Sequence, residues 1–271
     1  MDSRHIIRPL TTPADYAACV ELQQETWGPN FGDFVPPTIL KVAQRLGGVA
    51  AGAFDDDGLL LGFVFGFTGV EHGRVVHWSD MLAVRPGLRD AGLGRRLKEW
   101  QREAARRVGA EVMYWTFDPL VARNAHLNFN RLGARAHEYV RETYGEPTSL
   151  LHRGLGTDRL VVAWAITGEP ATSLCPDGTP SAVASELREA PLVGSTPPEE
   201  LPPAVRIVIP LDIHAVVSTD PAAAMGWRQT TRIAWEWALA NDYEVAGIWR
   251  EPAEGQAYYL LVRSDGSTVG A

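Results

Sequence analysis

The segment 80–97 carries the arrangement of residues that points most directly to a chemistry, the binding of phosphate. An apolar strand stops at Pro86, which has no amide hydrogen, and Gly92 and Gly94 follow, where the backbone can approach a ligand without a Cβ in the way. A helix should begin at Leu93, because apolar residues recur at helical spacing from there. The free amide groups of its first turn, with the positive end of the helix dipole behind them, would hold a pyrophosphate.

Two better-known phosphate loops do not fit this segment. It lacks the Gly-Lys-Ser/Thr ending of a Walker loop, and Arg89 stands where the first glycine of a dinucleotide-binding fingerprint should be. A plain connection between a strand and an amphipathic helix is the remaining alternative.

Strands and helices surround the phosphate segment in an order that predicts a domain of mixed helix and sheet. The expected elements are a strand at 5–10, helices at 14–26 and 37–46, strands at 49–54, 59–68 and 74–84, a helix at 93–108 and a strand at 112–117. The acidic turn between 54 and 59 should join its two strands as a hairpin. On the helix at 93–108, Lys98 is expected on the charged face, opposite Leu97.

The composition is that of a globular protein with an acidic surface. The chain has 271 residues, 45% of them hydrophobic, which is enough for one large core or two smaller ones. A net charge of −8 argues against nucleic acid or an anionic membrane as a partner and leaves basic protein substrates open. Cys19 and Cys175 stand far apart without other ligands at metal spacing, so we expect neither a disulfide nor a metal site. Neither a signal segment nor a membrane span is recognisable, and we therefore expect a cytoplasmic location.

The pattern Val84-x-Pro86-x-x-Arg89-x-x-Gly92-x-Gly94 resembles the acyl-coenzyme A signature of the GNAT superfamily of N-acyltransferases. The resemblance implies an α/β (α+β) fold whose mixed, mostly antiparallel central sheet is flanked by helices. It also implies acetyl-CoA or another acyl-CoA as cofactor, held by the loop and by a strand that splays from its neighbour. The residues that would contact coenzyme A are Leu82, Val84, Arg89, Asp90, Ala91, Gly92, Leu93, Gly94 and Arg95.

A second stretch, 120–133, should form a helix that ends at a glycine, and it is similar to the second signature of the same family. In this resemblance Asn124 would bond the pantetheine arm, whereas the residues alone leave a helix cap or a surface amide as alternatives. Phe129 would also line the cofactor, but it stands where the family usually has a tyrosine that protonates the departing thiolate. Phenylalanine has no proton to give. Either the thiolate leaves unaided or another acid serves, and the candidates are Tyr139, Tyr144 and His152.

Direct transfer to an amine also requires a proton acceptor. Asp80 is our candidate, because it is an acid on a mostly apolar strand, four residues before Val84 and hence expected on the same face. Burial there would raise its pKa toward a useful value. His77 and Glu71 are alternatives, and a role for Asp80 as the partner of an arginine stays open.

The rest of the chain suggests a second, smaller part. We expect a catalytic domain at 1–168 whose sheet is completed by strands at 134–140 and 159–166, a Pro-rich linker or surface excursion at 169–204, and a βαββ subdomain at 205–271.

Four arginines stand out in this part of the chain. Arg153 and Arg159 in a glycine-containing loop could clamp a carboxylate, or they could pair at the surface with Asp158 and Glu146. Arg228 and Arg232 lie four residues apart on one helix face and could reach an anionic group, although a solvated face is the favoured interpretation for them.

Over its whole length the chain looks like a branch of the GNAT superfamily that includes amino-acid N-succinyltransferases. The predicted function is acyl-CoA-dependent transfer of an acetyl or succinyl group to the amine of a small molecule, such as an amino acid. An antibiotic amine or a protein N-terminus are the other acceptors considered. A protein that binds acyl-CoA as a sensor without transfer is the alternative class, and a homodimer is left open.

Overall fold

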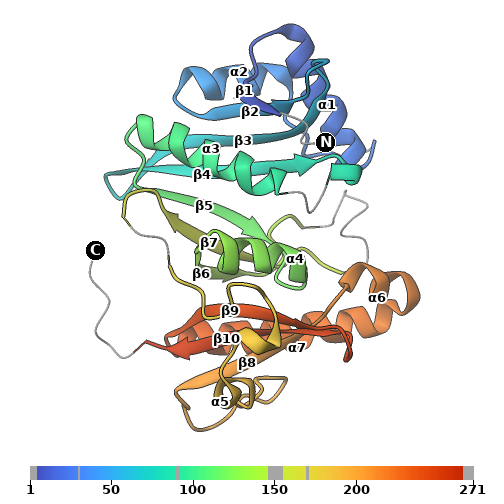
Figure 1. Ribbon diagram of the computed structural model, residues 1–271, viewed down its shortest axis with the longest axis vertical. Coiled ribbons are helices and arrows are strands. Elements are labelled where there is room, and N and C mark those ends of the chain that lie inside the picture. Colours follow the sequence, from blue (N-terminus) through green and yellow to red (C-terminus); the bar gives the residue numbers. More distant parts are fainter. Residues whose placement is uncertain (1–4, 30, 89–91, 146–154, 169–170, 265–271) are drawn as a thin grey trace. The chain divides into compact units, whose positions relative to one another are not determined.

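The computed structural model describes residues 5–29, 31–88, 92–145, 155–168 and 171–264 (Figure 1). Its contacts group the chain into two compact units. Unit 1 comprises Met1–Trp115, Thr148–Leu151 and Trp164–Glu169, and unit 2 comprises Thr116–Pro147, His152–Ala163 and Pro170–Ala271. The division into domains expected from the sequence stays a prediction.

Seven strands form one mixed, mostly antiparallel sheet, which confirms the predicted fold class (Figure 1). The strand order is β1-β2-β3-β4-β5-β7-β6, and β4 and β5 pair in parallel. The strands are β1 (Ile6–Pro9), β2 (Val49–Phe54), β3 (Leu60–Glu71), β4 (Arg74–Val84), β5 (Val112–Phe117), β6 (Arg135–Val140) and β7 (Arg159–Ala165). The predicted hairpin of β2 and β3 is present.

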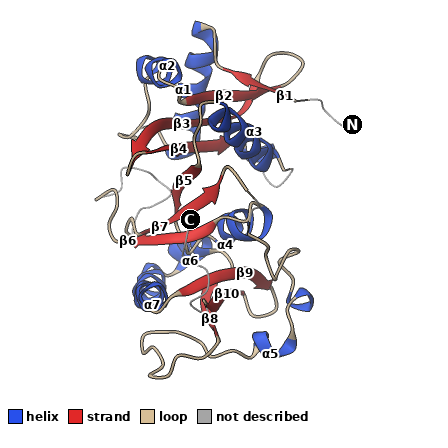
Figure 2. Ribbon diagram, turned by 90° about the vertical axis from the view of Figure 1, so that its left-hand side faces the viewer, coloured by secondary structure: helices blue, strands red, loops and turns tan. Residues whose placement is uncertain are grey.

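Three helices cover the two faces of β1 to β4 in unit 1 (Figure 2). They are α1 (Pro13–Trp27), α2 (Pro37–Arg45) and α3 (Leu93–Arg107), and a 3-10 turn at Pro86–Leu88 precedes α3. Helix α1 begins where the sequence predicts, because Thr12 and Asp15 form a capping box next to Pro13.

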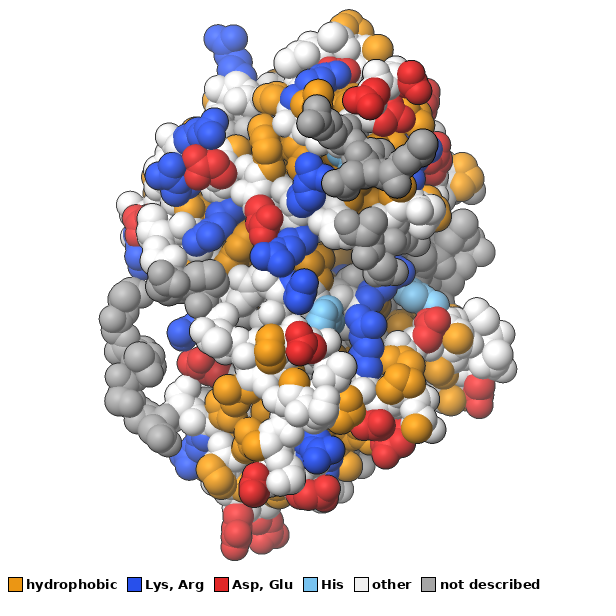
Figure 3. Space-filling model, in the orientation of Figure 1, with side chains coloured by type: hydrophobic (Ala, Val, Ile, Leu, Met, Phe, Trp, Pro, Cys, Tyr) orange, Lys and Arg blue, Asp and Glu red, His pale blue; other side chains and the backbone are white. Residues whose placement is uncertain are grey.

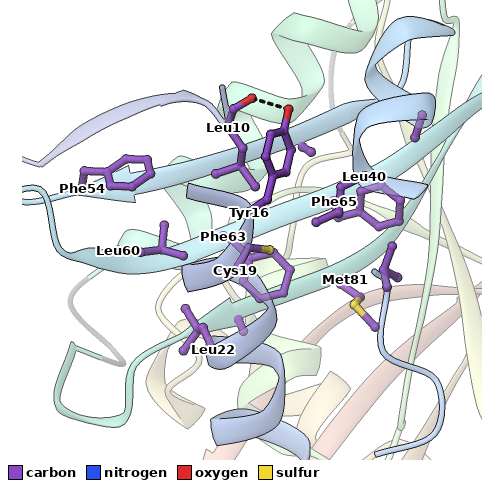
Figure 4. Packing of buried hydrophobic residues seen from close by; sticks show 14 residues of the cluster. Leu10, Tyr16, Cys19, Leu22, Leu40, Phe54, Leu60, Phe63, Phe65 and Met81 are labelled. Carbon is purple, nitrogen blue, oxygen red and sulfur yellow. Dashed lines mark hydrogen bonds between the residues drawn. The ribbon is translucent and has the colours of Figure 1, made fainter. Parts of the chain in front are cut away.

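Each face of the sheet in unit 1 has its own apolar core. Side chains of α1 and α2 pack with Phe63, Phe65 and Met81 on one face (Figure 4). On the other face, Leu93 and Leu97 of α3 pack with residues of β2 to β4.

Strand β4 contains a β-bulge at Asp80. In the register with β3, Phe65 is opposite Met81 and Gly66 is opposite Ser79, so Asp80 is the extra residue. Ser79 bonds to α3 and Leu82 packs on the α3 side, whereas Met81 lies on the α1 and α2 side. The alternation of faces is therefore shifted by one residue, and the prediction that Asp80 shares the face of Val84 is wrong.

Unit 2 contains a second sheet of three antiparallel strands, ordered β8-β10-β9. Its further elements are α4 (Ala122–Ala125), a π-helix at His126–Arg131, a 3-10 turn at Pro180–Ala182, α5 (Ser185–Arg188), β8 (Ala204–Pro210), α6 (Ile213–Thr219), α7 (Pro221–Ala240), β9 (Tyr243–Glu251) and β10 (Gln256–Arg263). The βαββ order is thus present, with α6 as an additional helix. Cys175 and Val183 of the Pro-rich segment pack with Trp249 in the core of this unit.

In the described part of the chain, none of the helices combines the length and the apolar composition that a membrane crossing requires.

Candidate functional site

Among the described residues, the first backbone amides of α3 have no hydrogen-bond partner within the helix. Gly92 adopts a left-handed conformation, with φ of 79°, and caps the helix without a side-chain hydrogen bond. Its carbonyl accepts the amide of Arg96, so the amides of Leu93, Gly94 and Arg95 precede the first hydrogen bond within the helix. The first turn contains no acidic residue and instead carries arginines, which the helix dipole disfavours there unless an anion is present.

Gly94 keeps this turn free of side chains at the end of β4. A Cβ at residue 94 would lie 3.8 Å from Cδ2 of Leu82 and 4.0 Å from Cγ2 of Val84, which are ordinary contact distances. The protein itself therefore has room for alanine here, and alanine would favour the helix by roughly 0.5–1 kcal/mol over glycine. The open space at Gly94 fits a ligand that passes close to the backbone. The predicted contacts Arg89, Asp90 and Ala91 lie outside the described residues.

Strand β4 loses its pairing with β5 before it ends. The described parallel pairs run from Val76 with Val112 to Trp78 with Tyr114, whereas β4 continues to Val84. From Ser79 onward, the described pairs of β4 are with β3 alone. The resemblance implies such a divergence of neighbouring strands next to the loop that is predicted to bind phosphate.

Asp80 lies where the two strands part. Its side chain is exposed and stands on the bulge, on the side of β4 that faces α1 and α2. Partial desolvation by the surrounding protein, followed by the negative charge of Asp33, raises the pKa of Asp80 above its usual value. A carboxylate with a raised pKa at an exposed position can accept a proton near neutral pH.

His77, the first alternative to Asp80, is buried in a chain of polar groups. Thr68 Oγ1 lies 3.0 Å from Nδ1 of His77 and 2.7 Å from the carbonyl of Gly47, and Gln101 Nε2 lies 3.0 Å from Nε2 of His77. Since the Thr68 hydroxyl donates to Gly47, Nδ1 of His77 is assigned the proton and Nε2 accepts from Gln101. Burial, and then the charge of Lys98, lower the pKa of His77 to about 4.

Glu71, the second alternative, ends β3 and is opposite Arg74 in the register. It is therefore at the other end of β4 from Val84.

The same polar chain contains a lysine that sequence reasoning placed wrongly. Lys98 is only 3% exposed, donates to Ser79 Oγ at 2.7 Å, and has Nζ 3.9 Å from the ring centroid of Trp115. Ser79 in turn donates to Gln101 Oε1 at 2.7 Å. Lys98 thus belongs to the buried stripe with Leu97, not to the charged face. The burial of Lys98 could have been predicted from the spacing of the buried residues Leu97, Gln101 and Ala105. Lys98 follows Leu97 directly and therefore borders the same stripe of the helix.

The other charged residues of α3 lie at the surface, where Figure 3 shows basic and acidic side chains interspersed. Arg95 pairs with Glu99 at 2.7 Å, and Arg106 pairs with Glu103 at 2.8 Å. Arg95, Glu99, Glu103 and Arg106 therefore form part of the exposed face of α3.

In unit 2, Asn124 lies partly buried in the short helix α4, and Phe129 lies in the π-helix that follows. Phe129 is 3% exposed and packs edge-to-face with Phe117 and Tyr259, at centroid distances of 5.9 and 6.0 Å. Its ring therefore contributes to the core of unit 2.

Two candidate acids are described in unit 2, and their hydroxyl groups differ in access. Tyr144 is 49% exposed, and its hydroxyl lies 3.0 Å from Thr116 Oγ1. The Tyr139 hydroxyl donates to Asp158 at 2.8 Å, and burial, followed by this carboxylate, raises the pKa of Tyr139. His152 lies outside the described residues.

The arginines singled out from the sequence are mostly engaged in the interior of unit 2. Arg228 is fully buried and donates to Asp118 at 2.6 Å, so a solvated face is wrong for it. Arg232 donates to both carboxylate oxygens of the buried Asp158, at 2.8 and 2.9 Å. Pairing of Asp158 at the surface is therefore also wrong. Arg159 is 4% exposed, and Arg153 lies outside the described residues.

No family model and no curated protein matches the sequence. Solved structures that are similar include the ribosomal-protein-S18-alanine N-acetyltransferase from Escherichia coli, with 16% identity, a TM-score of 0.46 and coverage of 61% of this chain and 96% of that chain. Nourseothricin acetyltransferase is similar with 21% identity and a TM-score of 0.45, covering 60% of this chain and 98% of that chain. Aminoglycoside 6'-acetyltransferase type Ii is similar with 18% identity and a TM-score of 0.47, and the match covers 61% of this chain and 99% of that chain. At such identities the likeness concerns the fold alone.

Proposed function

We propose that the protein is an acyl-CoA-dependent N-acyltransferase that moves an acetyl or succinyl group directly to the amine of a small molecule. The observation that carries this proposal lies within unit 1. In the described residues, β4 combines a bulge at Asp80 with an end beyond its pairs with β5, and it precedes a helix whose first amides form no hydrogen bond within the helix. A phosphate-binding helix start would then follow directly on the strand that carries the proton acceptor.

The described part of the loop suits the cofactor in charge and in space. The amides of Leu93, Gly94 and Arg95 would bind the pyrophosphate of coenzyme A, and the edge of β4 beyond its described pairs with β5 would bind the pantetheine arm through backbone groups. Bound acyl-CoA would supply the thioester carbonyl that the amine attacks. Leu82 and Val84 would flank the arm, since both pack under the start of α3.

Asp80 is the proposed general base. Its exposure and raised pKa suit the removal of a proton from an ammonium group, and Asp33 next to it adds negative charge that attracts such a group. His77 is less suited, because it is fully buried and both ring nitrogens are engaged by Thr68 and Gln101. A general base of this kind contributes about a hundredfold to ten-thousandfold to the rate.

Tyr144 is the proposed general acid for the departing thiolate. Among the described candidates its hydroxyl has the better access, because Tyr139 is committed to Asp158. The hydroxyl of Thr116 can hold the phenol of Tyr144 in position. Phe129, at the usual tyrosine position, lies in the core and has no proton to give.

Thiol release from acetyl-CoA and succinyl-CoA over a panel of amines tests this function. The proposal expects free coenzyme A to appear only when a suitable amine is present, in amounts equal to the acylated product. The second candidate, an acyl-CoA-binding sensor, is favoured by Phe129 alone. It predicts tight binding of acyl-CoA without thiol release for any amine in the panel.

A further inference from the structure

Among its described residues, the interior of unit 2 holds more positive than negative charge. Three guanidinium groups and two carboxylates gather there, and we name this set the arginine cluster: Arg159, Arg228, Arg232, Asp118 and Asp158. Arg159 and Arg228 are 4% and 0% exposed, and Asp118 and Asp158 are 5% and 0% exposed. Only Arg232 reaches the surface appreciably, with 23% of its side chain exposed. A buried charge without a partner destabilises a folded protein, so each charged group of the cluster is expected to have a partner.

Asp158 and Arg232 form a balanced pair. Asp158 accepts two hydrogen bonds from Arg232, one from the Tyr139 hydroxyl at 2.8 Å and one from the backbone amide of Glu142 at 3.1 Å. Both carboxylate oxygens are used in these bonds. Asp158 therefore has no capacity left for a second guanidinium group.

Asp118 alone has to balance the two remaining arginines. Its Oδ2 accepts from Nη2 of Arg228 at 2.6 Å, and its Oδ1 accepts from the backbone amide of Leu120 at 2.9 Å. Nη1 of Arg159 is 3.9 Å from the same Oδ2, which is too far for a hydrogen bond. Within the described residues, one positive charge of the arginine cluster thus has no carboxylate of its own.

The donors that this excess charge offers are also incompletely used. Nη1 of Arg228 is buried and forms no hydrogen bond within the described part of the chain, although Nε donates to the carbonyl of Leu155 at 3.0 Å. The Tyr139 hydroxyl donates to Asp158 at 2.8 Å, and the nearby Arg228 opposes the rise of the Tyr139 pKa through its charge and a side-chain interaction. Among the residues that the structure describes, Nη1 of Arg159 donates to one backbone carbonyl, that of Asp158 at 2.8 Å.

A partly exposed aromatic ring lies against the arginine cluster. The guanidinium carbon of Arg159 is 5.2 Å from the ring centroid of Tyr144, and Tyr144 is 49% exposed. Burial lowers the pKa of Arg159, and Asp118 offsets this effect only in part, as expected for a cation that lacks a full partner.

We infer that the arginine cluster is a binding site for the carboxylate of a small-molecule ligand, which Arg159 and Arg228 bind between them. The excess is one charge, and a single carboxylate matches it. The planar carboxylate also suits donation from two guanidinium groups. Only the source of the carboxylate, the acyl donor or the amine acceptor, rests on the proposed function.

Binding of free succinate to the full-length protein tests the site without any reference to transfer. Titration calorimetry should show binding of succinate to the parent and none of the uncharged analogue succinamide. In Arg159→Met the affinity for succinate should fall by roughly tenfold or more, as expected for the loss of a charged hydrogen bond. Arg250→Met is the matched control, because Arg250 is an exposed arginine of β9 in the same unit, and it should bind like the parent.

The thermal midpoint separates this site from a purely structural ion network. Without any anion, Arg159→Met should unfold at the same temperature as the parent or higher, because it removes a cation that lacks a partner. Succinate should raise the midpoint of the parent and of Arg250→Met and leave Arg159→Met unchanged. A large fall of the midpoint in Arg159→Met without anion, or an equal succinate response in all three proteins, would overturn the inference.

Two further results would contradict it. If inorganic phosphate binds to the parent and succinate does not, the site binds another kind of anion and not a carboxylate. Succinate that binds to Glu146→Gln but not to the parent would mean that Glu146, which lies outside the described residues, supplies the missing charge.

Kinetics then identify the source of the carboxylate. A preference for succinyl-CoA over acetyl-CoA that is lost in Arg159→Met assigns the site to the donor, and a preference for amino acids over their amides assigns it to the acceptor. An absence of transfer with every donor contradicts the proposed function while the binding of succinate still stands.

Discussion

Acidification should destabilise the protein through His77, and the size of this effect follows from its surroundings. His77 is fully buried and neutral, with a pKa of about 4, whereas a histidine in the unfolded chain has a pKa near 6.5. Between these values the unfolded chain binds a proton that the folded protein does not bind. The contribution of neutral His77 to the free energy of unfolding is therefore fully present above about pH 6.5 and is lost progressively as the pH falls toward 4.

Each pH unit in that interval removes about 1.4 kcal/mol, so a change from pH 7 to pH 5 should remove about 2 kcal/mol through His77. The variant His77→Gln lacks the titrating group but keeps a side chain that can bond to Thr68 and Gln101. Urea unfolding of parent and variant, followed by circular dichroism at both pH values, gives the comparison. All other groups titrate in both proteins, so their contribution cancels in the difference.

The advantage of the parent over His77→Gln in the free energy of unfolding should shrink by about 2 kcal/mol from pH 7 to pH 5. Parallel pH dependences of the two proteins would refute the reasoning. They would mean that His77 either titrates normally in the folded protein or is not enclosed by the polar chain.

The remaining predictions concern the groups that move protons. Asp80→Asn should lower turnover by roughly a hundredfold to ten-thousandfold and leave the dissociation constant of acyl-CoA nearly unchanged, and a variant as fast as the parent would exclude Asp80 as the base. Tyr144→Phe should lower turnover by about a hundredfold with unchanged thermal stability. Tyr139→Phe, the matched change at the buried hydroxyl, should instead lower the free energy of unfolding by about 1–3 kcal/mol, because Asp158 loses a hydrogen bond, and should spare the rate of the folded enzyme. If both tyrosine variants affect the rate alike, access does not distinguish the two phenols.

The order of elements in unit 1 could be predicted because local signals mark it. The capping box at Thr12, the acidic turn between β2 and β3 and the glycine before Leu93 each fix a boundary by chemistry within a few residues. The strands of the small C-terminal sheet could also be predicted, because their runs of apolar residues are typical of strands. The additional helix α6 is short and has only one fully buried residue, Ile213, so its pattern was weak.

The placement of single side chains could be predicted less well, since it depends on tertiary contacts. One extra residue in β4 changed the face of Asp80, and nothing in the local sequence announces a bulge. Lys98 and Arg228 are buried next to hydrogen-bond partners that are distant in sequence, Ser79 in one case and Asp118 in the other. The burial of Arg228 could have been predicted from its spacing, because it lies in the buried stripe of α7 with Thr231 and Trp235. The prediction of a solvated face followed its charge instead.

The binding of coenzyme A to the full-length protein tests the central claim most directly, and two glycine variants make the test specific. Gly94→Val places a side chain where the pyrophosphate is expected, at a position whose Cβ the protein itself can accommodate. Gly69→Val is the control, because Gly69 is an exposed residue of β3 with open space around it. Titration calorimetry should show one coenzyme A per chain with equal affinity for the parent and Gly69→Val, and an affinity for Gly94→Val that is weaker by about a hundredfold, as expected when the close approach of the phosphates is lost. A parent that does not bind coenzyme A, or a folded Gly94→Val protein that binds it as tightly as the parent, would contradict the account.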